Sequence, residues 1–186
     1  PHGAWQTQHG KKSFGWVLGN PPWARVKGES QTMDDHHNAR KWMIAHRSDY
    51  PVGGNKLAEA FLWKASLHIS KTGTAGIIVP AMTWFKAQSE QFRRQFFAQR
   101  EVWCLANFAN LAYVLFQKRA ENPASAVFFR PTPPGDGHFI VTYAPFVAEQ
   151  VANRPYREKR RAVTWSIIVN GAEMRDISNE SATAGK

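Results

Sequence analysis

The chain has a single cysteine, no long apolar run and comparatively few acidic residues. Cys104 alone cannot form an internal disulfide, which favours a reducing compartment. No apolar stretch approaches the roughly 20 residues of a membrane-spanning helix. The first residues, Pro1-His2-Gly3, also lack the basic and apolar regions of a secretory signal. These absences predict a soluble, cytoplasmic protein with no membrane partner.

The shortage of acidic residues leaves a strong positive charge. Twenty-four Lys and Arg face fourteen Asp and Glu, which gives a formal net charge of +10. A basic excess of this size favours a polyanionic partner, because each phosphate contact releases counterions. Nucleic acid is therefore the leading class of partner, and the alternative is that the charge only keeps the protein in solution.

Length and composition predict one fold-sized unit. With 186 residues and 43% apolar side chains, the chain can bury one sizeable core. The last stretch, 178–186, is small and polar like a linker, and Pro1 is not a natural start. We therefore expect the chain to be excised from a longer protein.

The first structural signal is a short apolar run that ends at two prolines. Residues 14–19 read FGWVLG and are followed by Asn20-Pro21-Pro22-Trp23. Proline cannot donate to a strand ladder and is unfavourable inside a helix, so the chain must stop at a rigid turn here. The pattern predicts a buried strand over 14–19.

The following segments alternate between helix and strand patterns. Residues 24–54 are polar and predict a long loop with one modest helix at 39–47. Apolar residues at every fourth position predict a helix that begins at Asn55 and ends with Lys71-Thr72-Gly73. The continuous apolar run 75–80, bounded by glycine and proline, predicts a central parallel strand.

Further alternation completes an α/β pattern. A helix is expected over 85–100, and strands over 101–108, 125–130 and 138–143. The fold class is therefore α/β with a mainly parallel sheet, and the two final strands are expected to form an antiparallel hairpin at its edge. Ligands bind beyond the carboxyl ends of strands in such sheets. Both the turn that begins at Asn20 and Pro80 lie at such ends.

The four residues after the first strand suit chemistry on an exocyclic base amine. The lone pair of such an amine is delocalised into the ring, so acceptors must polarise its protons. Asn20 offers a side-chain carbonyl and Pro21 a backbone carbonyl, and Pro21 and Pro22 hold both in place. The base must also leave the duplex, and Trp23 can stack on it.

At this point a family resemblance is clear. FGWVLGNPPW resembles motif IV of the adenine-N6 DNA methyltransferases, especially the large type IIG and phage-defence enzymes. The similarity continues, in family order, through the helix from Asn55, the strand ending at Pro80 and the segments up to Arg130. Only the tetrapeptide is sharply specific. A departure lies at Gly15, where the family often has Asp.

The resemblance implies a partial Rossmann-like methyltransferase fold and a set of functional residues. Asn20, Pro21, Pro22 and Trp23 carry over as catalytic residues, and Phe116 is the better match to a second base-stacking aromatic, with Tyr113 as a competitor. The family's cofactor is S-adenosylmethionine, whose glycine-rich turn and acidic ribose ligand precede this motif. Neither is found here, so we expect most of the donor site to lie outside the chain and the chain alone to be inactive.

The resemblance also divides the chain and implies partners. Residues 1–143 correspond to the C-terminal half of a catalytic domain, and 144–186 to a basic segment leading toward a target-recognition region. Double-stranded DNA, the rest of a parent methyltransferase chain, and restriction or defence subunits are the expected partners.

Two polar clusters lie outside the motif. The basic cluster can contact DNA phosphates or be a solvated face, and it consists of Arg154, Arg157, Lys159, Arg160 and Arg161. Asp34-Asp35-His36-His37 contains metal-ligand types, but adjacent side chains rarely converge on one ion. No metal is predicted, and the chemistry needs none.

Two other interpretations remain open. The same tetrapeptide serves methyltransferases that act on RNA amines or protein glutamine, although the long insert at 24–54 and the basic balance favour DNA. Alternatively, the chain is a non-catalytic nucleic-acid-binding remnant.

Overall fold

The computed structural model describes residues 14–26, 34–109, 123–138, 140–143, 146–149, 166–169 and 174–176. Within them, two sheets form. The larger sheet has six strands in the order β1-β2-β4-β3-β5-β8. The smaller sheet pairs β6 (Phe146–Glu149) with β7 (Ser166–Val169).

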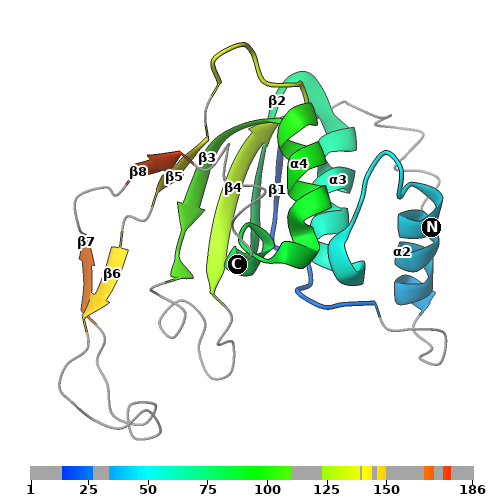
Figure 1. Cartoon of the computed structure of the whole chain (residues 1–186), viewed down its shortest axis with the longest axis horizontal. Helices are drawn as coiled ribbons and strands as arrows, with labels where there is room; N and C mark the ends of the chain where they lie inside the picture. Colours follow the sequence, from blue (N-terminus) through cyan, green and yellow to red (C-terminus); the bar gives the residue numbers. More distant parts are fainter. Residues whose placement is uncertain are drawn as a thin grey trace, which may run out of the picture.

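The six strands of the larger sheet are spread over the whole chain (Figure 1). They are β1 (Phe14–Gly19), β2 (Ile69–Pro80), β3 (Glu101–Asn107), β4 (Ala124–Arg130), β5 (Val141–Tyr143) and β8 (Met174–Asp176). β1 pairs with β2, and β3 with β5, in parallel. β4 is antiparallel to both β2 and β3, and β8 is antiparallel to β5. The α/β class is confirmed, but the sheet is mixed rather than mainly parallel.

The predicted hairpin of the last two strands is wrong. β4 does not pair with β5; it lies between β2 and β3, where Val127 and Phe129 are fully buried. An alternating strand with a large apolar side chain at every second position is stabilised most at the centre of a covered sheet. β5 is added on the far side of β3 from β4.

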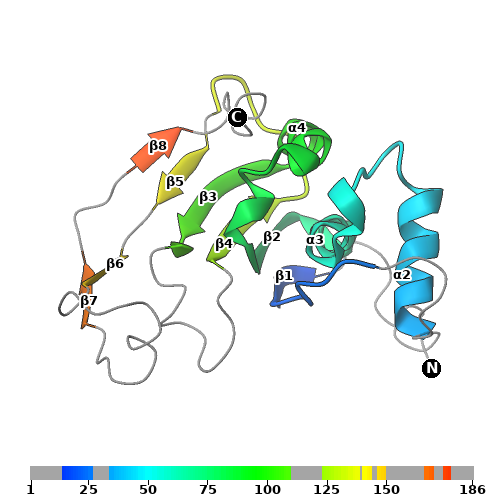
Figure 2. The same cartoon turned by 60° about the horizontal axis from the view of Figure 1, so that its bottom comes forward.

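Two helices cover one face of the sheet. Figures 1 and 2 show α3 (Leu57–His68) and α4 (Glu90–Gln99) lying over the same face, with α2 (Asp34–Ala45) outside α3. The core between helices and sheet is rich in aromatic rings. Trp63 of α3 lies edge-on to Phe96 of α4, with ring centroids 5.0 Å apart, and Phe96 meets Phe129 of β4 at the same distance. These contacts fix α3 and α4 on the strands that carry the site.

The helix boundaries differ from the sequence expectation at several places. α3 ends at His68, and residues 69–73, which were expected to close that helix, belong to β2. Gly73 is required by packing: a Cβ there would lie 2.7 Å from the carbonyl oxygen of Phe14 and 2.8 Å from that of Gly15. The glycine therefore allows β2 to approach β1 rather than capping a helix.

The other helices are displaced by a few residues. α2 begins at Asp34 instead of Ala39. α4 begins only at Glu90, because the 3-10 turns η2 (Ala81–Thr83) and η3 (Ala87–Ser89) precede it. No helix among the described residues is both long and apolar enough to cross a membrane.

β1 was expected to be buried, but it is an edge strand. Its backbone pairs only with β2 among the described strands, and the side chains of Trp16 and Leu18 are 65% and 71% exposed. Val17, on the opposite face, packs against the core beneath the helices. The apolar run is therefore half covered, and its helix-facing side fixes the position of the turn that follows it.

Candidate functional site

The tetrapeptide leaves the sheet at the carboxyl end of β1. Asn20 is the first residue after the strand and is exposed, as is Pro22. Pro21 is buried, and Trp23 is half-buried with its ring packed against the core. The turn thus presents Asn20 outward while Pro21 and Trp23 hold it to the protein.

A cavity of about 210 Å³ lies beside Trp23. Its walls come from four segments: the turn after β1, the start of α3, the end of β2 with the turn after it, and the start of β4. The lining residues are Trp23, Ala24, Arg25, Lys56, Ala58, Pro80, Met82, Thr83, Lys86 and Pro123. The tetrapeptide and Pro80 lie at the carboxyl ends of the parallel strands β1 and β2, as predicted. Trp23 and Pro80 both line the cavity, whereas Asn20 does not.

Backbone hydrogen bonds hold the segment after Trp23 against the start of α3. Arg25 and Lys56 form an isolated antiparallel bridge. The Val26 amide donates to the Asn55 carbonyl at 2.9 Å, and the Leu57 amide donates to the Ala24 carbonyl at 3.0 Å. This short ladder fixes the backbone from which Arg25 and Lys56 project toward the cavity.

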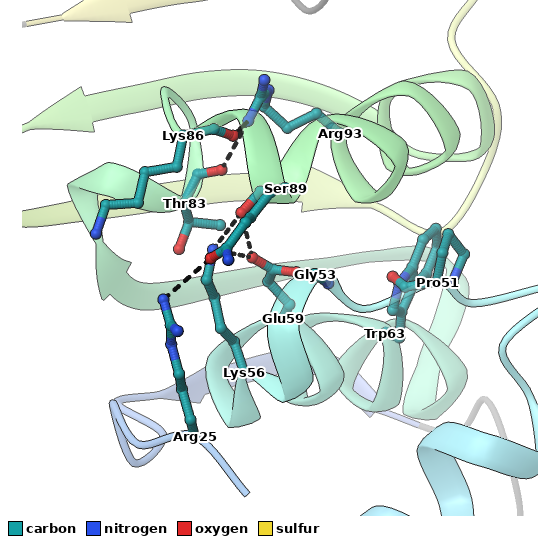
Figure 3. A network of polar contacts seen from close by, with 11 residues as sticks. Arg25, Pro51, Gly53, Lys56, Glu59, Trp63, Thr83, Lys86, Ser89 and Arg93 are labelled. Carbon is teal, nitrogen blue, oxygen red and sulfur yellow. Dashed lines mark hydrogen bonds and ion pairs between the residues drawn. The ribbon is translucent and has the colours of Figure 1, made fainter. Parts of the chain in front are cut away.

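A buried carboxylate organises the cavity wall behind Lys56 (Figure 3). Glu59 has no exposed surface, and it accepts hydrogen bonds from Ser89 Oγ and from the Gly53 amide, both at 2.6 Å. The Lys56 ammonium lies 3.2 Å from Glu59 and donates to Ser89 Oγ at 2.5 Å. One carboxyl group therefore joins η1 (Gly53–Asn55), α3 and η3.

The turns after β2 are fixed by two further groups. The buried guanidinium of Arg93 donates to the carbonyl of Lys86 at 2.6 Å and to that of Thr83 at 3.4 Å. Trp84 donates from its indole nitrogen to Ser125 Oγ at 2.8 Å, which attaches the turn to β4. Both interactions bring side chains of the 82–86 segment to the cavity wall.

The charged residues that line the cavity are all positive. Three cationic residues and no carboxylate line it. Behind Lys56, burial raises the pKa of Glu59 above its ordinary value, while Ser89, Lys56 and Gly53 act in the opposite direction by stabilising the ionised form. Burial lowers the pKa of Arg93, and the negative charges of Glu59 and Glu90 oppose that effect. The cavity is suited to an electron-rich or anionic group.

Several predicted residues lie outside the described part of the chain. These are the aromatic candidates Phe116 and Tyr113 and the basic cluster Arg154, Arg157, Lys159, Arg160 and Arg161. Asp34-Asp35-His36-His37 begins α2. Within the residues that the structure describes, no group of three or more His, Cys, Asp or Glu could hold a metal ion.

Sequence reasoning missed the polar residues around Trp23. Arg25, Lys56 and Lys86 are separated along the chain and belong to no motif, so only the fold shows that they share a cavity. Glu59 did carry a signal, since it is an acidic residue inside the otherwise apolar LAEAFLW segment of a helix. A lone acid on a buried helical face usually has a partner.

Comparisons with known proteins support the fold. The structure is similar to a type I restriction-modification methyltransferase subunit from Streptococcus thermophilus, with a TM-score of 0.55 and 16% identity, over 76% of this chain and 28% of that chain. A modification subunit of a putative type I restriction enzyme from Vibrio vulnificus has the same TM-score and identity, over 88% of this chain and 34% of that chain. The DrdV-DNA complex matches with a TM-score of 0.50 and 12% identity, over 69% of this chain and 14% of that chain.

At such identities these structures support the fold alone, and this chain spans about a third of their length or less. No curated protein matches. The model of the Eco57I restriction-modification methylase family, however, matches residues 2–115, which is more than half of the chain and includes Asn20 to Trp23 and most of the cavity lining. The chain belongs to the Eco57I restriction-modification methylase family.

Proposed function

We propose that this chain is part of an enzyme that methylates the N6 amine of adenine in DNA with S-adenosylmethionine. One observation carries the proposal: in a chain of this family, Asn20-Pro21-Pro22-Trp23 leaves the carboxyl end of β1 so that Trp23 forms a wall of a basic cavity. Strand carboxyl ends are where α/β sheets bind ligands.

Asn20, Pro21 and Trp23 each have a defined task in this proposal. The side-chain oxygen of Asn20 and the backbone carbonyl of Pro21 accept hydrogen bonds from the adenine amine, which concentrates electron density on the nitrogen. Asn20 is exposed and can reach a base that arrives from solvent, while the buried ring of Pro21 fixes the turn. Trp23 stacks on the base once it has left the duplex.

The cavity beside Trp23 does not fit the methyl donor. S-adenosylmethionine would supply a methyl group from a cationic sulfonium, and its ribose hydroxyls favour a carboxylate partner. The cavity beside Trp23 has three cations and no carboxylate in its lining. Like charges in a confined space repel strongly, so in this proposal the donor is held by residues other than those that line this cavity.

The DNA partner and the division of the chain follow from the same proposal. Residues 1–143 would supply the catalytic part, and 144–186 the basic segment leading to target recognition. The cluster from Arg154 to Arg161 would track phosphates, in keeping with the +10 net charge. Restriction or defence subunits and the rest of a longer methyltransferase would be the protein partners.

Replacing Asn20 tests the proposal directly. Asn20→Ala in the full-length parent protein should lower adenine methylation of host DNA by about 10²–10³-fold, because one of two fixed acceptors is lost. Modified-base sequencing of DNA from expressing cells measures the effect. Asn38→Ala removes an exposed asparagine on α2 and should leave methylation unchanged.

Unchanged adenine methylation in the Asn20→Ala strain would contradict the assignment. If the parent protein methylated RNA or protein glutamine but left DNA unmodified, the proposed substrate would be wrong, although the role of the tetrapeptide in amine methylation would be retained. Absence of any methylation by the parent would instead favour a non-catalytic nucleic-acid-binding protein.

A further inference from the structure

Three cationic side chains reach the cavity beside Trp23 from three different parts of the fold. Arg25 follows the tetrapeptide, Lys56 precedes α3, and Lys86 lies between η2 and η3 (Figure 3). They are 30 or more residues apart in sequence, so their meeting is a product of the fold. The other walls are mainly apolar, with Trp23, Pro80 and Pro123 among them. The cavity therefore has an apolar part and a cationic part.

The three cations differ in how far their charge is already neutralised. Lys56 is paired with the buried Glu59 carboxyl at 3.2 Å, and its side chain is only 13% exposed. Arg25 donates one hydrogen bond, from Nη2 to Gln88 Oε1 at 3.1 Å, which leaves most of the five guanidinium donors available. Lys86 is exposed, and its ammonium makes no hydrogen bond or ion pair with the described residues. Two positive charges, on Arg25 and Lys86, are thus available at the cavity.

Both available cations project from constrained backbone. The Arg25 backbone is bridged to Lys56, and Gln88 orients its guanidinium. The Lys86 carbonyl accepts from Arg93, and the Lys86 amide donates to the Met82 carbonyl at 3.1 Å. Fixed backbone lowers the entropy that is lost when such side chains close on a ligand.

We infer that Arg25 and Lys86 bind the phosphate group of the nucleotide whose base lies against Trp23. The inference rests on the proposed function, and it extends the site from the base to its phosphodiester. Arginine forms paired hydrogen bonds to phosphate oxygens, and lysine adds a point charge. Lys56, held by Glu59, contributes a wall rather than a free charge. The phosphate then anchors the flipped nucleotide while Trp23 stacks on its base.

The test compares two single-stranded trinucleotides of sequence TAT on the 186-residue chain. One has ordinary phosphodiester linkages and the other has neutral methylphosphonates. In NMR chemical-shift titrations at fixed salt, the wild-type chain should bind the charged trinucleotide about tenfold more tightly or better, since hydrogen bonds to charged groups are strong. In the double variant Arg25→Ala/Lys86→Ala, the two affinities should become equal. Lys71→Ala, an exposed lysine at the opposite end of β2 from Pro80, should keep the preference.

Equal affinities in the wild-type chain, no saturable binding of the charged trinucleotide, or the same loss in Lys71→Ala would each overturn the inference. Circular dichroism confirms that the variants fold, which their exposed positions favour. A third trinucleotide, TTT, separates the inference from the proposed function. If TTT binds as well as TAT but still requires phosphates, the phosphate site stands and the adenine assignment fails. If TAT is preferred over TTT while its charge makes no difference, the phosphate site is wrong and the adenine assignment stands.

Discussion

Glu59 shows how one side chain determines the form of the site. A carboxyl group without exposed surface is tolerated only when hydrogen bonds and an opposite charge replace the lost water. Ser89, the Gly53 amide and Lys56 supply them, and each belongs to a segment next to the cavity. Because Glu59 and Ser89 both contact the Lys56 ammonium, they also hold Lys56 in the cavity wall.

The pKa of Glu59 gives the first prediction at this scale. Because burial raises this pKa in the folded state, the folded protein binds the Glu59 proton more tightly than the unfolded chain does. The associated stability is fully present below the ordinary glutamate pKa of 4.5 and is lost as the pH rises through the folded pKa. Glu59→Gln removes the titrating group. Its side-chain NH2 cannot accept a hydrogen bond and would face the Gly53 amide or the Ser89 hydroxyl, so the free energy of unfolding at pH 4 should fall by about 1–3 kcal/mol.

Urea unfolding of both proteins between pH 4 and 8 measures this difference. The stability advantage of the wild-type protein over Glu59→Gln should shrink with rising pH. Glu90→Gln is the matched control, since Glu90 forms a largely exposed pair with Arg94, and it should change stability by less than about 1 kcal/mol. A wild-type advantage that grows with pH would show that Lys56 and Ser89 outweigh the burial of Glu59.

At the scale of elements, the sequence predicted the type of each segment better than its limits or its neighbours. The strand before Asn20 and the helix that begins near Asn55 are present because their apolar patterns dominate locally. The end of α3 was misplaced because Gly73 has the same appearance as a helix cap and as a glycine between two close strands. Only the position of the Phe14 and Gly15 carbonyls distinguishes the two.

The order of the strands in the sheet could not be predicted from the sequence either. The SAVFF pattern of β4 is compatible with an edge or a centre position, and its place between β2 and β3 depends on which faces α3 and α4 cover. The tetrapeptide could be recognised because four adjacent residues carry its chemistry. The cationic part of the cavity could not be recognised, because Arg25, Lys56 and Lys86 become neighbours only through β2, α3 and the turns.

The contact between η1 and η3 gives a prediction at this scale. A Cβ on Gly53 would lie 2.1 Å from the backbone oxygen of Gln88, so Gly53→Ala must push the two turns apart. The hydrogen bond from the Gly53 amide to Glu59 should weaken as a result. We expect a loss of about 1–3 kcal/mol in the free energy of unfolding, as is typical of overpacking.

Gly135→Ala provides a matched control, because a Cβ at Gly135 would have nothing within 4 Å. Its stability in urea should stay within about 0.5 kcal/mol of the wild-type value. If Gly53→Ala were as stable as Gly135→Ala, the approach of η1 to η3 would not be constrained as the structure shows, and the link from Glu59 to the cavity wall would lose its basis.

At the scale of the whole molecule, the described fold combines a covered face with an open edge. α3 and α4 cover one face of the sheet (Figure 2) and support the cavity, while β1 presents Trp16 and Leu18 to solvent. The positive charge of the cavity has the same sign as the net charge of +10. The positive cavity lining and the positive net charge both favour nucleic acid over a cationic ligand. The difference between these two ligands can be measured on the chain itself.

Calorimetry of the 186-residue chain with S-adenosylmethionine should therefore detect no low-micromolar binding. The donor's sulfonium would meet the available charges of Arg25 and Lys86 in the described cavity, whose lining contains no carboxylate. The charged TAT trinucleotide, titrated into the same sample, shows that the protein is folded and able to bind. Low-micromolar affinity for the donor would place its site within this chain and contradict the expectation that the chain alone is inactive. Binding of the trinucleotide without the donor would leave the chain as the part that receives the base, with donor binding supplied by other residues of the enzyme.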